Sequence, residues 1–199
     1  MTGLQIVLTI NQRSKSIPYP AATHSGSQNF VFRVLKGRLD KIEGIQEAKD
    51  SSCIKQLLCT LNAEASPFFS VGCEKSFNRS PNGFWAKGYI EFAFNYSKLV
   101  SDAVQYFPLF FHFSRYASDY VTKHDVQFWW ELQQARFEAA DCEGFSCCVW
   151  ITTGQFGSSA ESQVEWESAV EMLGAFIEAV KIRNPDSQPI YGRTDRQER

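Results

Sequence analysis

Three glutamates in the second half of the chain have spacings that place them on one side of a helix. Glu167, Glu171 and Glu178 are separated by four and seven residues, and at 3.6 residues per turn these positions fall within a narrow arc. Like charges at such spacings weaken a helix by a few tenths (about 0.2–0.5) of a kcal/mol per pair, so helix stability does not explain them. They suit attraction of a cationic partner, and a solvated helix face is the alternative interpretation.

The acidic excess extends beyond these three residues. Residues 124–180 carry ten acidic side chains, and Arg136 is the only Lys or Arg among them, although the whole chain has a net charge of only −2. An uncompensated field of this kind speeds association with a basic protein. We therefore predict a site that binds a basic protein partner. It comprises Glu131, Asp141, Glu143, Glu167, Glu171 and Glu178.

Metal and redox chemistry are not expected. Asp141 and Glu143 are residue types of a metal site or an acid/base pair, but residues 141–144 are explained more simply as a hairpin turn. The six cysteines include no CxxC pair, and the adjacent Cys147 and Cys148 point to opposite faces of a strand. We predict six reduced, structural thiols, no metal and no cofactor. A zinc site built from Cys142, Cys147 and a distant histidine is the weaker alternative.

Catalytic motifs are also absent. The sequence contains no Walker loop, GxGxxG, GxSxG or HExxH pattern. A nucleophilic Cys–His pair need not be close in sequence, but nothing marks one cysteine above the others near His24, His112 or His124. We therefore predict no catalytic residues and favour a protein that is not an enzyme.

Nucleic-acid binding through the N-terminal region is a further alternative. Aromatic rings such as Trp85 and Tyr89 could stack on bases beside a basic region. The sequence pI of about 5.9 and the lack of a recognised motif make nucleic acid an unlikely partner. The basic residues concerned are Arg13, Lys15, Arg33, Lys36, Arg38 and Lys41.

The acidic helix must be anchored by an apolar stripe. Apolar residues recur at three- and four-residue spacings, which predicts one buried face. They are Trp166, Ala169, Val170, Leu173, Phe176, Ile177 and Val180. Ser158, Ser159 or Ser162 suits the N-cap, and Pro185 ends the pattern. The runs 128–132 and 145–153 before this helix predict two strands.

The first half predicts further strands and helices. In residues 4–10, apolar and polar side chains alternate, which predicts a strand, and the composition of residues 13–27 is typical of a loop. Residues 30–34 and 39–42 predict the two arms of a hairpin around Gly37. Ile54, Leu57, Leu58 and Leu61 predict a helix that begins near Ser51 or Ser52. Strands at 69–77 and 84–94 follow around a clear turn, then a helix from about residue 97 that is interrupted near Pro108. Residues 107–113 are either helix or buried strand.

The order of elements repeats along the chain. Residues 68–94 with the helix after them resemble residues 128–153 with theirs, and the pairs Gly83-Phe84 and Gly144-Phe145 stand 61 positions apart. A ββα duplication is one interpretation. We predict an α+β domain over residues 1–182, in which a mostly antiparallel sheet packs two or three helices on one face. Residues 183–199 are mostly polar, and we predict that they form a disordered tail.

No run of residues is apolar and long enough to span a bilayer, so we expect a cytoplasmic protein. The sequence favours a non-catalytic interaction protein, similar in layout to inhibitors and immunity proteins, that binds a basic surface through its acidic C-terminal half. The alternative is a small-molecule site, catalytic or not, between the sheet and the aromatic segment 107–113. The oligomeric state is not encoded in any of these patterns.

Overall fold

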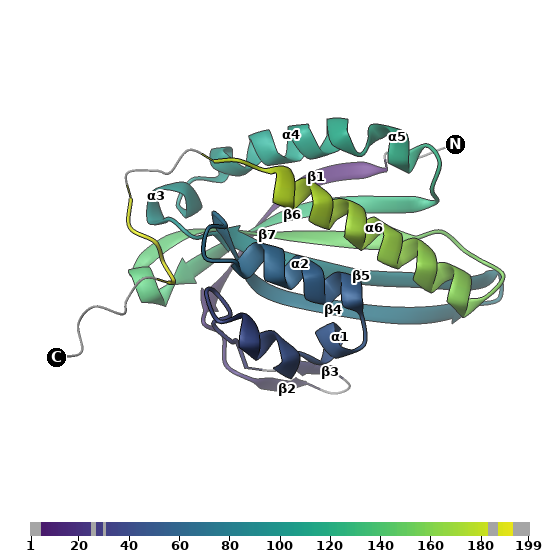
Figure 1. Cartoon of the computed structure of the whole chain (residues 1–199), viewed down its shortest axis with the longest axis horizontal. Helices are drawn as coiled ribbons and strands as arrows, with labels where there is room; N and C mark the ends of the chain where they lie inside the picture. The colour runs from purple at the N-terminus through teal and green to yellow at the C-terminus, as the bar shows by residue number, and fades with distance from the viewer. Residues whose placement is uncertain (1–4, 25–26, 30, 183–186, 193–199) are drawn as a thin grey trace.

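Five long strands form the central sheet of the computed structural model (Figure 1). The structure describes residues 5–24, 27–29, 31–182 and 187–192. The sheet order is β1-β6-β7-β5-β4, and β1 is parallel to β6 whereas all other neighbours are antiparallel. The strands are β1 (Ile6–Ile17), β4 (Phe68–Ser80), β5 (Gly83–Phe94), β6 (Val126–Phe137) and β7 (Cys142–Thr153); β2 (Ala22–His24) pairs separately with β3 (Ser27–Asn29).

Helices cover one face of this sheet, as Figure 1 shows for α2, α4 and α6. The helical elements are η1 (Leu39–Gly44), α1 (Gln46–Lys49), α2 (Ser52–Asn62), α3 (Ser97–Val100), η2 (Ala103–Tyr106), α4 (Phe107–Tyr116), α5 (Ser118–Val121), η3 (Glu138–Ala140) and α6 (Ser159–Ala179). This architecture confirms the predicted α+β class with a mostly antiparallel sheet. No helix in the described part of the chain is long and apolar enough to cross a membrane.

Helix α6 forms where the apolar stripe predicts it. Ser158 accepts a hydrogen bond from the Glu161 backbone N–H, and the Glu161 carboxylate accepts one from the Ser158 N–H, so two otherwise unpaired donors are satisfied. Trp166 and Leu173 are fully buried, together with most of the predicted stripe. The indole N–H of Trp166 donates to the Ile151 carbonyl, which fixes α6 across the sheet.

Two hairpins supply the four antiparallel strands. The turn between β4 and β5 confirms the predicted turn, and β5 buries Ile90 and Phe92 beneath the helices while Lys87, Tyr89 and Glu91 alternate onto the other face. The hairpins meet through β5 and β7. This symmetrical order is what a ββα duplication predicts, but the helix after β5 breaks into α3, η2 and α4, and the duplication stays a prediction.

The predicted hairpin at residues 30–42 is wrong. Residue 30 lies outside the described residues, but residues 31–38 contain no strand and residues 39–44 form η1. Phe32 and Leu35 are buried at a spacing of three, and the Lys36 ammonium is buried with them. Lys36 donates to the carbonyls of Ala63, Ser66 and Phe68. These tertiary contacts override the local alternation that favours a strand.

The predicted loop and tail also need correction. Strand β1 continues to Ile17, β2 spans Ala22–His24 and β3 begins at Ser27, so the predicted loop at 13–27 is wrong at both ends. Residues 187–192 are not disordered, because Ile190 is buried and the backbone of Tyr191 exchanges hydrogen bonds with the Asn95 side chain. Residues 183–186 and 193–199 of the predicted tail lie outside the described residues. Residues 107–113 are helical, as part of α4. The predicted interruption near Pro108 is wrong, because Pro108 lies in the first turn of α4 and the break falls between α3 and η2.

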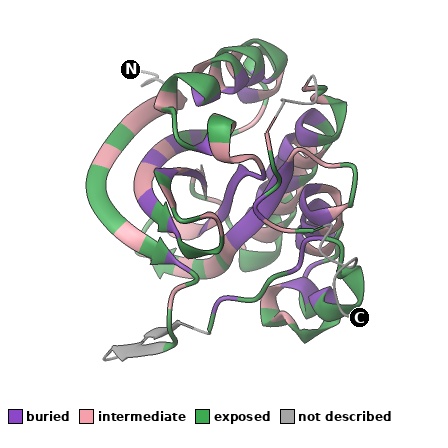
Figure 2. Ribbon diagram, turned by 90° about the vertical axis from the view of Figure 1, so that its left-hand side faces the viewer, coloured by how far each residue is buried: buried purple, intermediate pink, exposed green. Residues whose placement is uncertain are grey.

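The sheet curls toward the side that the helices leave open, which we call the inner face. Lys15 on β1 forms an ion pair with Glu91 on β5, although β6 and β7 separate these two strands in the sheet order. Phe137 on β6 packs against Phe69 on β4 in the same way, with ring centroids 6.2 Å apart. Figure 2 shows the strong bend of the strands. The inner face is therefore concave where these side chains meet.

Candidate functional site

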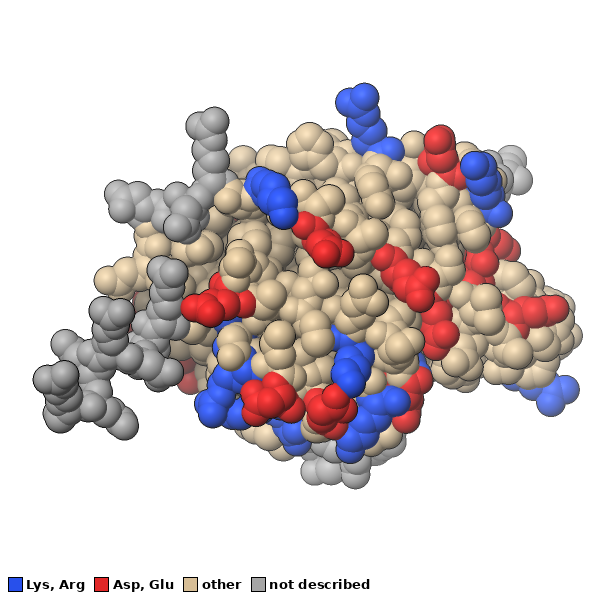
Figure 3. All heavy atoms as spheres, in the orientation of Figure 1, with Lys and Arg blue, Asp and Glu red and all other residues tan. Residues whose placement is uncertain are grey.

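The three glutamates of α6 lie on the helix-covered side of the molecule. Glu171 and Glu178 are exposed, and within the described part of the chain their carboxylates have neither a hydrogen bond nor an ion pair. Glu167 is half-buried and accepts a hydrogen bond from Gln163, which leaves its charge uncompensated. Figure 3 shows acidic side chains in a row over this helix. At 1.5 Å per residue the row extends for roughly 16 Å.

Asp141 and Glu143 belong to a different place. They flank the tip of the β6–β7 hairpin, and both carboxylates form ion pairs with the Arg136 guanidinium. These interactions raise the pKa of Arg136, chiefly through the hydrogen bond to Glu143. This single cation offsets one of the two negative charges, and both carboxylates lie at the hairpin tip rather than on α6.

Glu131 lies on the inner face, on the opposite side of the sheet from α6. Its carboxylate accepts hydrogen bonds from Asn11, Gln133 and the indole N–H of Trp150. Burial alone would raise the pKa of Glu131, but these hydrogen bonds and the charge of Lys15 hold it below the ordinary value. The six predicted acidic residues therefore occupy three separate places.

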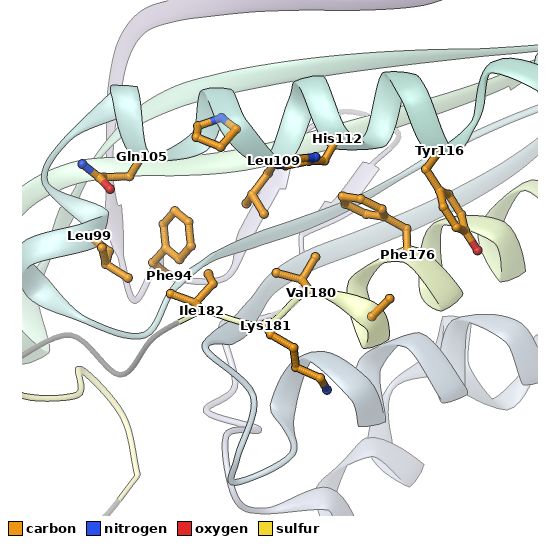
Figure 4. A pocket seen from close by; sticks show the side chains of 12 residues that line it. Phe94, Leu99, Gln105, Leu109, His112, Tyr116, Phe176, Val180, Lys181 and Ile182 are labelled. Carbon is orange, nitrogen blue, oxygen red and sulfur yellow. The ribbon is translucent and has the colours of Figure 1, made fainter.

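A pocket opens between α4 and the C-terminal end of α6 (Figure 4). Its volume is about 620 Å³ and its walls are mainly apolar, with His112 and Gln105 among the polar groups. Phe176 anchors the wall by packing against Phe113 and Tyr116, at centroid distances of 5.3 and 5.6 Å. The lining residues are Phe94, Leu99, Gln105, Pro108, Leu109, His112, Tyr116, Phe176, Ala179, Val180, Lys181 and Ile182.

The pocket and the acidic row share helix α6. Ala179 lines the pocket and follows Glu178 directly in the sequence, about 100° further around the helix. Phe176, on the pocket wall, stands between Glu171 and Glu178 along the axis. One helix thus presents carboxylates that form no ion pair with any described residue and, around its side, an apolar depression, with the Lys181 ammonium next to Glu178, where it donates to the Glu178 backbone carbonyl. We call this combination the α6 site.

The basic N-terminal residues do not form one surface. Lys36 is 4% exposed, and burial lowers the pKa of its ammonium to about 8. Lys15 points into the inner face toward Glu91 and Gln133. Arg33 donates to the carbonyl of Gly44. At least two of the six cations are therefore withdrawn from contact with a phosphate backbone.

The thiols and imidazoles are dispersed. All six cysteines are free, and burial raises the pKa of the Cys147 and Cys148 thiols well above the ordinary value. His124 stacks on Tyr120 and contacts the Glu165 carboxylate at 3.1 Å. Among the described residues, no three His, Cys, Asp or Glu side chains are grouped so as to hold a metal ion.

The polar network of the inner face is the feature that sequence reasoning missed. It runs from Glu91 through Lys15 and Gln133 to Glu131, and so joins residues from β5, β1 and β6. Alternation along β5 indicates that Lys87, Tyr89 and Glu91 share a face, but no local signal pairs that face with β1. Comparison of the chain with protein-family models, curated proteins and solved structures gives no match.

Proposed function

We propose that this protein is a non-catalytic, cytoplasmic interaction protein, inhibitor-like or immunity-like, that binds a basic partner protein at the α6 site. The observation that carries the proposal is that Glu171 and Glu178, which form no ion pair in the described part of the chain, lie beside an apolar pocket on the same helix. A segment with an apolar anchor flanked by Lys or Arg would complement both features. The six free thiols support a reducing compartment.

The carboxylates and the pocket of the α6 site would contribute differently to binding. Exposed carboxylates at the rim of an interface steer the encounter and act mainly on the association rate. An apolar side chain that fills the pocket would supply affinity, on the order of 2–3 kcal/mol for one Leu- or Phe-sized group. The pocket volume of about 620 Å³ lies within the usual range of ligand sites, about 300–1,000 Å³.

Capture of a partner protein from native lysate tests whether the row of carboxylates on α6 takes part in binding. The variant Glu171→Lys/Glu178→Lys reverses two charges of the row, and Glu138→Lys/Glu143→Lys reverses two exposed charges near the hairpin tip. Both variants change the net charge equally, so non-specific electrostatic effects are matched. We expect the first to lose the partner that the wild type and the second retain. Equal capture by all three proteins would refute the α6 site.

The variant Ala179→Trp tests the pocket without changing the charge. Ala179 is exposed at the pocket wall, so the indole can occupy the cavity while α6 stays folded. We expect weaker capture of the same partner and an unchanged circular dichroism spectrum. Full retention would show that the pocket takes no part in binding.

A small-molecule site is the second candidate, and the apolar pocket with His112 and Gln105 favours it. The same variants separate the two candidates. A small ligand inside the pocket would be excluded by Ala179→Trp but would be nearly indifferent to reversal of Glu171 and Glu178. A basic protein partner would respond to both changes.

A further inference from the structure

We propose that the inner face of the sheet is a second binding site, one that takes a neutral oligosaccharide. The strand register sets three aromatic residues in one row across the sheet. Trp129 on β6 is opposite Trp150 on β7, which is opposite Tyr89 on β5. Neighbouring strands are about 4.8 Å apart, so the row extends for roughly 10 Å.

The two indoles of this row are held at their edges by hydrogen bonds, and the ring of Trp129 stays accessible, whereas the Lys87 ammonium lies 4.8 Å from the centre of the Trp150 ring. The Trp129 indole N–H donates to Thr9 Oγ1 at 2.7 Å, and that of Trp150 donates to the Glu131 carboxylate at 3.2 Å. Trp129 is 43% exposed, although a large aromatic ring is normally buried in a folded protein. Tyr89 packs beside Trp150 with ring centroids 4.8 Å apart. The row is therefore a preformed aromatic platform whose exposed end is Trp129.

Polar groups border the platform. The next row places Glu131, Cys148 and Glu91 side by side on β6, β7 and β5. Beyond it, Gln133 lies opposite Ser146, whose hydroxyl is fully buried and has no hydrogen-bond partner. Ser146, Cys148 and Glu91 are buried, so Glu131 and Gln133 are the partly exposed polar groups of these two rows.

The charges of the inner face are balanced and favour a neutral ligand. Glu91 and Glu131 would repel a phosphate or sulfate group, and this disfavours a nucleic acid. Lys15, paired with Glu91, and Lys87, whose ammonium lies 4.8 Å from the centre of the Trp150 ring, would repel an organic cation. A pyranose ring has an apolar C–H face that stacks on an aromatic ring and hydroxyls at its rim that exchange hydrogen bonds with carboxylates and amides.

This site is independent of the α6 site, because the sheet lies between them. Glu131 and Trp150 project away from the helices, whereas Ile151, next to Trp150 in the chain, accepts the hydrogen bond from Trp166 of α6. The two proposals therefore fail or succeed separately.

Calorimetric and tryptophan-fluorescence titrations of the intact protein test the inference. The probes are cellotetraose, xylotetraose, maltotetraose and chitotetraose, each taken to millimolar concentration. We expect at least one to bind and to change the emission of the inner-face tryptophans. Trp129→Ala should weaken that binding roughly tenfold or more, since it removes one stacking surface from the platform.

Phe111→Ala is the matched control, because Phe111 is 65% exposed on α4, on the other side of the sheet. It should leave binding unchanged. Trp129→Phe keeps an aromatic face and should retain most of the affinity, which separates stacking from a general effect on folding. The inference is overturned if none of the four tetrasaccharides binds, or if binding is the same in Trp129→Ala as in the wild type.

Discussion

Glu131 shows how a single carboxylate can connect stability to pH. Its oxygens accept three hydrogen bonds from neighbouring side chains, and these favour the ionised form in the folded protein. The folded carboxylate therefore holds a proton less tightly than the unfolded one. The unfolded chain binds more protons in acid, so the stabilisation is present above the ordinary pKa of 4.5 and is lost as the pH falls through the lowered pKa.

Urea unfolding of the wild type and of Glu131→Gln measures this contribution. The variant should be less stable at pH 7, because an amide cannot accept all the hydrogen bonds that a carboxylate accepts. The difference between the two proteins should shrink as the pH is lowered below 4.5, the ordinary pKa of the group. A difference that is constant with pH would mean that the charge of Glu131 is not stabilised by its neighbours.

At the scale of elements, two glycines near α6 differ in how much space their surroundings leave for a side chain. At Gly174, within α6, an added Cβ would lie 3.9 Å from the Cβ and Cδ1 atoms of Leu57, an ordinary contact distance. At Gly88, on β5, an added Cβ would lie 2.3 Å from the Glu74 carbonyl oxygen and 2.6 Å from the Trp166 ring. The first site tolerates a methyl group, whereas the second is closed to it.

We therefore expect Gly174→Ala to raise the free energy of unfolding by about 0.5–1 kcal/mol, since alanine loses less backbone entropy in a helix. Gly88→Ala should lower it by about 1–3 kcal/mol through overpacking. Thermal or urea denaturation of the two variants decides between these signs. If Gly174→Ala were as destabilising as Gly88→Ala, the distance between α2 and α6 would be smaller than described.

The elements differ in how far the sequence alone could predict them. Periodicity was sufficient for α2, α6 and the β4–β5 hairpin, since their buried faces follow the local pattern. For the second hairpin, the predicted turn at 141–144 is wrong, because β6 continues to Phe137 and pairs with β7 from Cys142 onward. Periodicity was insufficient at residues 31–36, where Lys36 is held by three carbonyls brought there by α2 and β4. It also missed the second half of β1, whose polar sequence pairs with β6 in parallel across a break in register between Asn11 and Lys15.

The same distinction applies to the candidate sites. The phase of Glu167, Glu171 and Glu178 follows from helical geometry, and the helix is observed. Glu131 lies on the opposite side of the sheet from these three residues, because side chains alternate between the two faces along β6. The inner-face network could not be predicted, since it needs the curl of the sheet that brings Lys15 to Glu91.

The whole molecule has two surfaces of different character on opposite sides of one sheet. The helix-covered side offers a pocket and a row of carboxylates, and the inner face offers an aromatic row with balanced charges. Net charge alone, at −2, reveals neither. If both proposals hold, this separation would let a basic partner and a neutral ligand bind at the same time.

The association rate with the captured partner, measured from low to physiological ionic strength, tests the central proposal most directly. We predict that the wild-type rate falls steeply as salt screens the carboxylates, with a Debye length of about 8 Å at physiological ionic strength. Glu171→Lys/Glu178→Lys should slow association about tenfold or more at low salt, and Glu138→Lys/Glu143→Lys should not. Equal rates for both variants and the wild type, independent of salt, would contradict binding of a basic partner at the α6 site.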